Sequence, residues 1–308
     1  MNIKEIEKDG PGFPFLLTQI PEPPKKLFVA GSWPPTFGDG TPVNAETKYL
    51  CVVGARRHTS YGREACEELV AGLKDYNICI VSGLALGIDA IAHEAALAAG
   101  LPTIAFPGSG LASSVLYPPR NQRLAERIVK AGGALLSEFA MHARAAPWHF
   151  PQRNRLMAGI SHATFVIEAK LPSGTLITSK LAQEYNRDVF ALPGSIFSEL
   201  SKGPNMLISK GACTIRSSED ILEALDFKVR HPEDDPEITP TSSETLSQED
   251  KKILNILIEP MQKETLIHAL SKEENMSTSN VNIQLSLMEL SGLIVEENGL
   301  IKKARKYP

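Results

Sequence analysis

Three glycine-containing loops of this chain could hold a phosphate. Each follows an apolar run, and they are "GARRHTSYG" (54–62), "SGLALG" (82–87) and "PGSG" (107–110). Glycine allows a close backbone approach, and amides at a helix start carry partial positive charge. One such loop is a weak signal because turns also need glycine, but three together favour anion binding. The candidate residues are Gly54, Arg56, Arg57, Ser82, Gly83, Gly87, Gly108, Ser109 and Gly110.

A fourth segment, which is expected to be a loop at 142–161, combines cations with aromatic rings. It contains Arg144, Arg153, Arg155, Trp148, His149 and Phe150, and no acid lies between Glu138 and Glu168. Arginines neutralise phosphates, and ring faces accept bases that have left a duplex. The composition therefore favours single-stranded nucleic acid, with Phe150 as the base-stacking platform. The alternative is a core ring beside structural arginines, and Trp148 contributes less if its ring only packs.

The stretch Ser173-Gly174-Thr175 is expected to open a helix whose amides face the same cleft. Lys180 either reaches that cleft or is a solvated helix lysine. Asp89 and His93 lie four residues apart, which is typical of a first-turn acid and an interior contact rather than a catalytic pair. Neither a Walker motif nor the dinucleotide pattern GxGxxG is present. No cofactor and no metal site are therefore expected.

Apolar runs alternate with helical stretches between residues 46 and 228. The expected strands are 49–54, 77–82, 102–107, 134–139, 163–169 and 188–193, and the expected helices are 62–74, 87–99, 120–131, 174–186 and 218–226. Strands apolar on both faces, separated by crossover helices, indicate a parallel sheet covered on both sides. The predicted fold class is α/β, an extended Rossmann-like domain. Ligands bind at the carboxyl ends of the strands in such sheets.

Both flanks of this domain differ from it in composition. Residues 1–45 are rich in proline and predict an extended lead-in, and 229–245 predict a linker. Residues 246–308 contain three amphipathic stretches and then a turn at Asn298-Gly299. This order predicts a small winged-helix domain.

Composition restricts the compartment more than the partner. The net charge is −4, and residues 1–228 carry +1 whereas 229–308 carry −5, so a basic surface would have to be local. The four cysteines lack CxxC spacing, which favours reduced thiols over zinc. With no membrane-length apolar run and no signal segment, a cytoplasmic protein is expected.

Several motifs together resemble the DprA (Smf) family of bacterial DNA-processing proteins over residues 14–226. They include "SGLALGID", "FPQRNRLMAGIS" and "VIEAKLPSGTLITSK". The resemblance implies a homodimer that binds single-stranded DNA without sequence preference, protects incoming DNA in natural transformation and helps load RecA. It implies no catalysis. The family's site residues fall on Gly54, Arg56, Ser82, Gly83, Gly87, Pro107 to Gly110, Phe150, Arg153 and Arg155.

This chain departs from the family pattern in three places. Only the tail of the family's amino-terminal helical domain is present, and Pro147-Trp148 stands where some members place a lysine. The stretch resembling a recognition helix, 277–293, contains no Lys or Arg. Because duplex readers neutralise phosphates, a protein contact is favoured over duplex DNA for this module.

Two other functions compete with DNA binding. Phosphoribohydrolases that activate cytokinins use a glutamate after a Gly-Thr pair, and here Thr178 occupies that position after Gly174-Thr175. A hydroxyl cannot replace the carboxylate, which disfavours hydrolysis. A transcription regulator that senses a small phosphate is disfavoured by the uncharged recognition helix.

Overall fold

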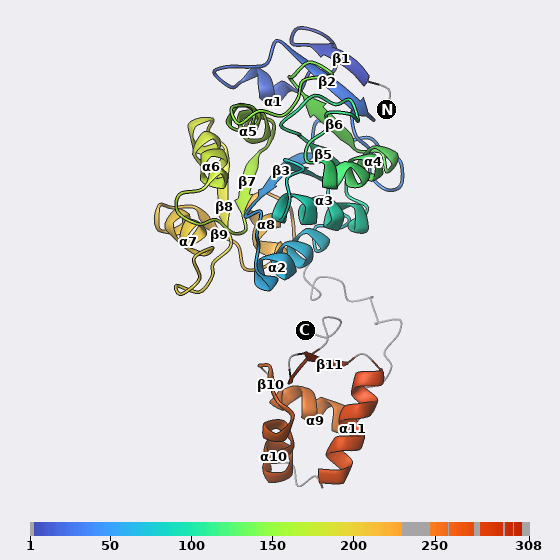
Figure 1. Ribbon diagram of the computed structural model, residues 1–308. Coiled ribbons are helices and arrows are strands. Elements are labelled where there is room, and N and C mark those ends of the chain that lie inside the picture. Colours follow the sequence, from blue (N-terminus) through green and yellow to red (C-terminus); the bar gives the residue numbers. More distant parts are fainter. Residues whose placement is uncertain are drawn as a thin grey trace. The chain divides into compact units, whose positions relative to one another are not determined.

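The computed structural model describes residues 3–229 and 247–303, except 258, 274–277, 292 and 298 (Figure 1). Contacts divide the chain into two compact units, Met1–Val229 and Arg230–Pro308. Apart from Val229, the predicted linker lies outside the described residues. No described helix combines the length and the apolar character needed to cross a membrane.

The first unit contains a nine-stranded sheet in the order β1-β2-β6-β5-β4-β3-β7-β8-β9. Neighbouring strands from β6 through β9 pair in parallel, and β1 and β2 extend the β6 edge in antiparallel pairing. The strands are β1 Ile3–Glu7, β2 Lys26–Gly31, β3 Lys48–Val53, β4 Ile78–Ser82, β5 Thr103–Ala105, β6 Ala134–Ser137, β7 Ala163–Val166, β8 Asp188–Ala191 and β9 Cys213–Thr214.

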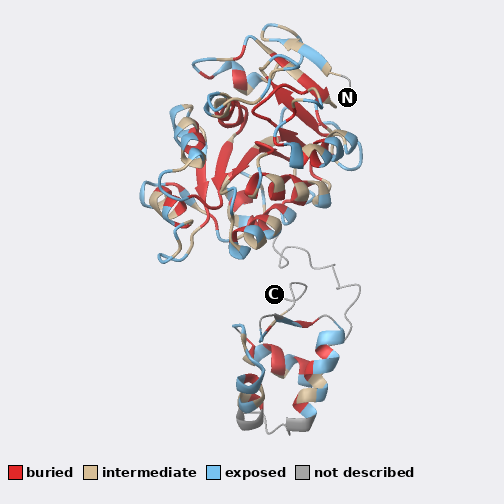
Figure 2. Cartoon of the chain, in the orientation of Figure 1, coloured by how far each residue is buried: buried red, intermediate tan, exposed pale blue. Residues whose placement is uncertain are grey.

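Helices cover both faces of this sheet, and its strands are largely buried (Figure 2). Along β3, Leu50 and Val52 join the core formed with α2, α3 and α8, whereas Cys51 and Val53 join the core formed with α1, α5, α6 and α7. This is the alternation expected of a strand buried on both sides. The helices are α1 Phe15–Thr18, α2 Ser60–Ala71, α3 Ile88–Ala99, η1 Pro119–Asn121, α4 Gln122–Lys130, α5 His149–Ile160, α6 Gly174–Glu184, α7 Lys202–Ser209 and α8 Ser218–Ala224.

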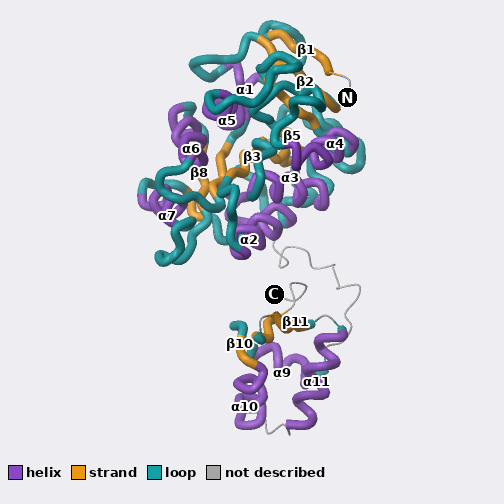
Figure 3. The backbone as a smooth tube through the Cα atoms, in the orientation of Figure 1, coloured by secondary structure: helices purple, strands orange, loops and turns teal. Residues whose placement is uncertain are grey.

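The predicted α/β class is confirmed, and all six expected strands and five expected helices are present with shifted ends. Two local predictions are wrong. The lead-in is not merely extended, because it supplies β1, α1 and β2. The loop expected at 142–161 is helical from His149 to Ile160. The structure also adds α7 (Figure 3) and β9 (Figure 1).

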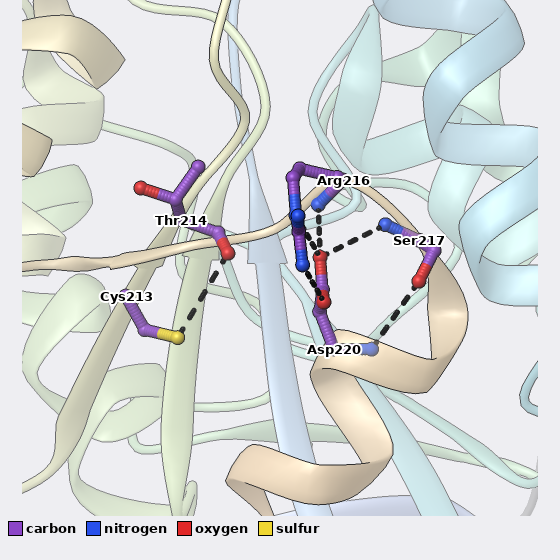
Figure 4. A network of polar contacts seen from close by, with 5 residues as sticks. All are labelled: Cys213, Thr214, Arg216, Ser217 and Asp220. Carbon is purple, nitrogen blue, oxygen red and sulfur yellow. Dashed lines mark hydrogen bonds and ion pairs between the residues drawn. The ribbon is translucent and has the colours of Figure 1, made fainter.

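A polar network fixes the connection from the edge strand β9 to α8 (Figure 4). Ser217 caps α8 by accepting from the Asp220 backbone N–H over 3.4 Å, and Asp220 accepts from the Ser217 backbone N–H over 3.3 Å. The Asp220 carboxylate also accepts from the Arg216 guanidinium, with an Nη2–Oδ1 distance of 2.8 Å. The reciprocal cap satisfies amides that would otherwise lack partners at the helix start.

Within its described residues, the second unit contains three helices and a three-stranded sheet in the order β10-β12-β11. Its elements are α9 Gln248–Ile256, β10 Met261–Gln262, α10 Lys263–Glu273, α11 Thr278–Leu290, β11 Ile294–Glu297 and β12 Leu300–Lys303. Leucine and isoleucine side chains from all three helices form its core. This order of elements is consistent with the winged-helix interpretation.

Candidate nucleic-acid interface

A cavity of about 600 Å³ opens at the carboxyl end of the sheet, between the loops that follow β3 and β7. Strands β4, β5 and β6 lie in succession on one side of β3, and β7, β8 and β9 lie in succession on its other side. The strand order therefore reverses between β3 and β7, and α/β folds bind ligands at such a topological switch point. Predicted site residues in its wall are Gly54, Arg56, Arg57, Phe150, Arg153, Ser173 and Gly174. A small second cavity shares Arg56, Phe150 and Arg153 and adds Gly83 and Gly108.

The loop after β3 presents Arg56 and Arg57, both exposed, to the cavity. Thr59 anchors the far end of this loop. Its backbone N–H donates to Glu168 Oε2 over 2.9 Å, and its hydroxyl donates to Glu168 Oε1. Glu168 is 2% exposed and follows β7, so one carboxylate ties together the two loops at the switch point.

Gly87 lets the loop that follows β4 pack closely against the loop that follows β3, which contains Arg56 and Arg57. Its φ is +84°, and a Cβ there would lie 2.3 Å from the Ala55 carbonyl oxygen and 2.6 Å from that of Arg56. Only glycine suits both this conformation and this approach. Gly87 therefore supports the backbone at Ala55 and Arg56, although it does not itself line either cavity.

Arg153 is bonded within the fold although it also lines both cavities, and its role as a phosphate contact stays a prediction. It is 5% exposed, and its Nη1 donates to the carbonyl oxygens of Gly83 and Phe106. Gly83 is packed so closely that a Cβ would lie 1.9 Å from Arg153 Nη1. Burial lowers the pKa of Arg153, and the negative charge of Asp89 opposes that shift.

Asp89 is the acid in the cavity wall. It is 6% exposed, and its Oδ2 accepts from the backbone N–H of Gly83 over 3.1 Å and of Ala85 over 3.4 Å. Burial raises the pKa of Asp89, whereas Arg153 and these two amides favour the carboxylate. The side chain holds the loop after β4 and balances the buried guanidinium.

Besides Gly87 and Gly110, four other predicted residues lie outside both cavities. Arg155 binds Glu138 and donates to the Glu22 carbonyl oxygen over 2.7 Å. The buried Ser82 hydroxyl donates to Val52 O, and the buried Ser109 hydroxyl donates to Gly110 O. These groups are engaged within the fold. The remaining residue, Lys180, has a 76% exposed side chain 3.6 Å from Glu184 Oε1, so it is a surface helix lysine.

Gly110 and Gly108 serve close packing. A Cβ on Gly110 would lie 2.3 Å from the Ala140 carbonyl oxygen, and one on Gly108 would lie 2.6 Å from the ring of Phe150. Gly54 packs in the same way on Ile88 of α3, with a Cβ distance of 2.6 Å. Gly174 differs, because nothing lies within 4 Å of its Cβ position. The backbone at the start of α6 is therefore open.

Sequence reasoning missed several wall residues, among them Lys170, Asn154 and Met157. Lys170 precedes the Ser-Gly-Thr turn, and its position in "EAKLPSGT" was the available signal. Asn154 Nδ2 donates to Gly174 O over 3.4 Å and links α5 to the start of α6. The cavity wall thus contains the cations Arg56, Arg57, Arg153 and Lys170 against the single acid Asp89. This local excess suits an anion although the chain is acidic overall.

Comparison with known proteins identifies the family. A model described as DNA recombination-mediator protein A matches residues 5–226. The chain belongs to this family. Protein Smf of Escherichia coli is 35% identical over 304 residues, which is 98% of this chain and 77% of that protein. DNA processing protein DprA of Streptococcus pneumoniae is 40% identical over 215 residues, 70% of this chain and 72% of that protein. The family resemblance inferred from the motifs is confirmed.

Solved structures of family members share the fold of the first unit. DNA processing protein A of Streptococcus pneumoniae aligns with a TM-score of 0.65 and 36% identity, over 75% of this chain and 76% of that chain. The Helicobacter pylori protein aligns with a TM-score of 0.61 and 28% identity, over 73% and 96% respectively. The work on that protein concerns its single-stranded DNA binding mode.

Proposed function

We propose that the chain binds single-stranded DNA without sequence preference at the Arg56 cavity, defined as the 600 Å³ cavity above. The observation that carries the proposal is its wall of four cations and one acid, set at the switch point of a recombination-mediator fold. Arg56 and Arg57 are exposed and can each neutralise a phosphate. The free space beside Gly174 at the start of α6 offers a further place for an anion to approach the backbone.

Arg56→Ala tests the cavity directly. Loss of one phosphate contact should weaken binding of all oligonucleotide sequences alike and reduce the slope of log affinity against log salt by about 0.7. The measurement is anisotropy of labelled oligonucleotides at several salt concentrations. Arg127→Ala is the matched control, because Arg127 is an exposed arginine paired with Glu94 on α3, outside the cavity. Equal slopes for the two variants would remove Arg56 from the interface.

The chain acts in this proposal by binding and not by catalysis. The position of the phosphoribohydrolase glutamate is held by Thr178, which is 1% exposed and lines the cavity. The one acid in the wall, Asp89, is bonded to two backbone amides. Incubation with nucleoside monophosphates should release no free base by chromatography. Release that disappears in Asp89→Asn would establish an enzyme instead.

The same proposal includes the partners implied by the family. The bound strand is protected during natural transformation and passed to RecA, and the protein acts as a homodimer. Support comes from the family's description as a recombination mediator. Sedimentation of the full chain tests the dimer. RecA filament assembly on single-stranded DNA, followed through RecA's ATP hydrolysis, should accelerate when this protein is present and should not accelerate with Arg56→Ala.

A further inference from the structure

Phe150 lines the Arg56 cavity, but its ring already has close neighbours. The Arg56 guanidinium carbon lies 5.4 Å from the ring centroid, and the Tyr117 ring lies 5.8 Å away at 59°. Gly108 packs so tightly that a Cβ there would lie 2.6 Å from a ring carbon. A base-stacking platform needs a free ring face. The half-buried Phe150 ring is better suited to shaping the wall.

Trp148 has the free surface that Phe150 lacks. Its residue is 69% exposed, and it immediately precedes α5. Only His149 separates it along the chain from Phe150, whose ring contacts Arg56. An indole exposed to this degree offers a large apolar face to an unpaired base.

The indole is braced although it is exposed. The His149 ring meets it edge-on, with centroids 5.9 Å apart at 85°. His149 in turn stacks on Phe139 at 3.9 Å and 18°. A side chain held in place before binding loses less conformational entropy when a ligand stacks on it. This row of three rings, Phe139, His149 and Trp148, is therefore a prepared surface.

The charge around the indole also suits a nucleic acid. Arg144 is exposed four residues earlier, and the first turn of α5 contains no acid. No Asp or Glu occurs between Glu138 and Glu168 in the sequence. A phosphate chain can therefore pass Trp148 without meeting a local carboxylate from this segment.

We propose that Trp148 is the base-stacking platform beside the Arg56 cavity, an inference that rests on the proposed function. A phosphate is neutralised at Arg56, and a neighbouring unpaired base stacks on the Trp148 indole. This reverses the ranking that the sequence predicts for Phe150 and Trp148. It also explains a preference for single strands, because a base that remains paired cannot lie against the ring.

Intrinsic fluorescence tests the stacking, because the chain contains only two tryptophans, Trp33 and Trp148. In Trp33→Phe, Trp148 is the sole indole. Titration with an unlabelled oligo-dT of about twenty nucleotides should quench its emission with the same midpoint as the anisotropy of a labelled oligo-dT. The matched control is Trp148→Phe, in which Trp33 remains; its Nε1 donates to Gly12 O over 2.7 Å. That variant should bind without quenching.

Affinity gives a second readout. Trp148→Ala should weaken oligo-dT binding roughly 5- to 150-fold with an unchanged salt slope, and Trp148→Phe should retain most affinity. Circular dichroism checks the fold of each variant. Normal anisotropy binding with no quench in Trp33→Phe, or an unchanged affinity in Trp148→Ala, would overturn the platform and leave the proposed function intact. Absence of oligo-dT binding by the unaltered chain would instead reject the proposed function and the platform with it. Quenching by RecA and not by oligo-dT would mean a protein-docking tryptophan and would likewise reject the platform.

Discussion

Arg153 is a buried residue that connects two loops of the site. One guanidinium nitrogen joins the carbonyl oxygen of Gly83, after β4, to that of Phe106, after β5. Asp89 supplies the nearby negative charge. A buried charge is tolerated when it has both hydrogen bonds and a counter-charge, and removing one member leaves the other exposed to the full desolvation cost.

Replacing Arg153 should therefore lower the free energy of unfolding, and this effect on stability should be its main effect. Arg153→Met removes both hydrogen bonds and leaves Asp89 buried without its cation. We expect the free energy of unfolding to fall by about 3–5 kcal/mol in urea titrations. The exposed pair at Arg127 and Glu94 provides the comparison, and Arg127→Ala should cost about 0–1 kcal/mol. If Arg153→Met unfolds like the unaltered chain but loses affinity, Arg153 is a phosphate ligand after all.

The sequence predicts where the arginines gather but not which way they face. Arg153 and Arg155 stand in the same motif, yet Arg153 bonds to loop carbonyls and Arg155 bonds to Glu138 and the carbonyl of Glu22. The partners come from segments 17 to 133 residues away in the chain. The spacing of residues within one motif carries no information on such distant contacts. The sequence therefore does not predict how far each of these two arginines is buried.

At the scale of elements, the loop after β3 depends on Glu168. This carboxylate accepts from the backbone N–H and the hydroxyl of Thr59. A Cβ on Gly62 would lie 2.4 Å from it, so α2 packs directly on the carboxylate. The arginines of the cavity are thus placed by a residue that follows a different strand.

Glu168→Ala should loosen that loop. The half-buried Thr59 amide loses its acceptor, and we expect a loss of about 1–3 kcal/mol in the free energy of unfolding. Oligo-dT affinity should fall as well, because Arg56 and Arg57 lose their fixed position. Glu184→Ala, on the exposed surface of α6, should change neither measurement by much. An unaltered affinity in folded Glu168→Ala would show that the loop holds its shape without this tie.

Strands buried on both faces are readable from sequence, and elements that depend on partners are not. The runs at β3, β4 and β7 are apolar throughout, so their existence follows from composition. β2 was missed because its flanks contain prolines and its pairing with β6 spans about a hundred residues. α5 was missed because Pro151 interrupts the pattern, although its place in the first turn is compatible with a helix.

Across the whole molecule, the two units differ in net charge. Residues 1–228 carry +1 and residues 229–308 carry −5. On α11 the exposed side chains include Ile283, Leu287 and Leu290, and the helix contains no Lys or Arg. An apolar helix surface without cations gains little binding free energy from contact with phosphates. We therefore assign single-strand binding to the first unit.

Removal of residues 230–308 should leave most of the affinity for oligo-dT. The first unit forms a compact body with its own two-sided core, and it contains every wall residue of the Arg56 cavity. Anisotropy titration of the shortened chain is the measurement. A loss greater than about tenfold, equivalent to about 1.4 kcal/mol, would mean that the second unit contributes directly to binding.

We expect this chain to distinguish single strands from duplexes at the Arg56 cavity. The most direct measurement is competition: one labelled oligo-dT is displaced by unlabelled single strands and by duplexes of equal length, at several salt concentrations. We expect single strands of different sequence to compete about equally, duplexes to compete far less, and affinity to fall as salt rises. Duplexes that compete as well as single strands, or an affinity that does not change with salt, would show that the Arg56 cavity does not select single-stranded DNA.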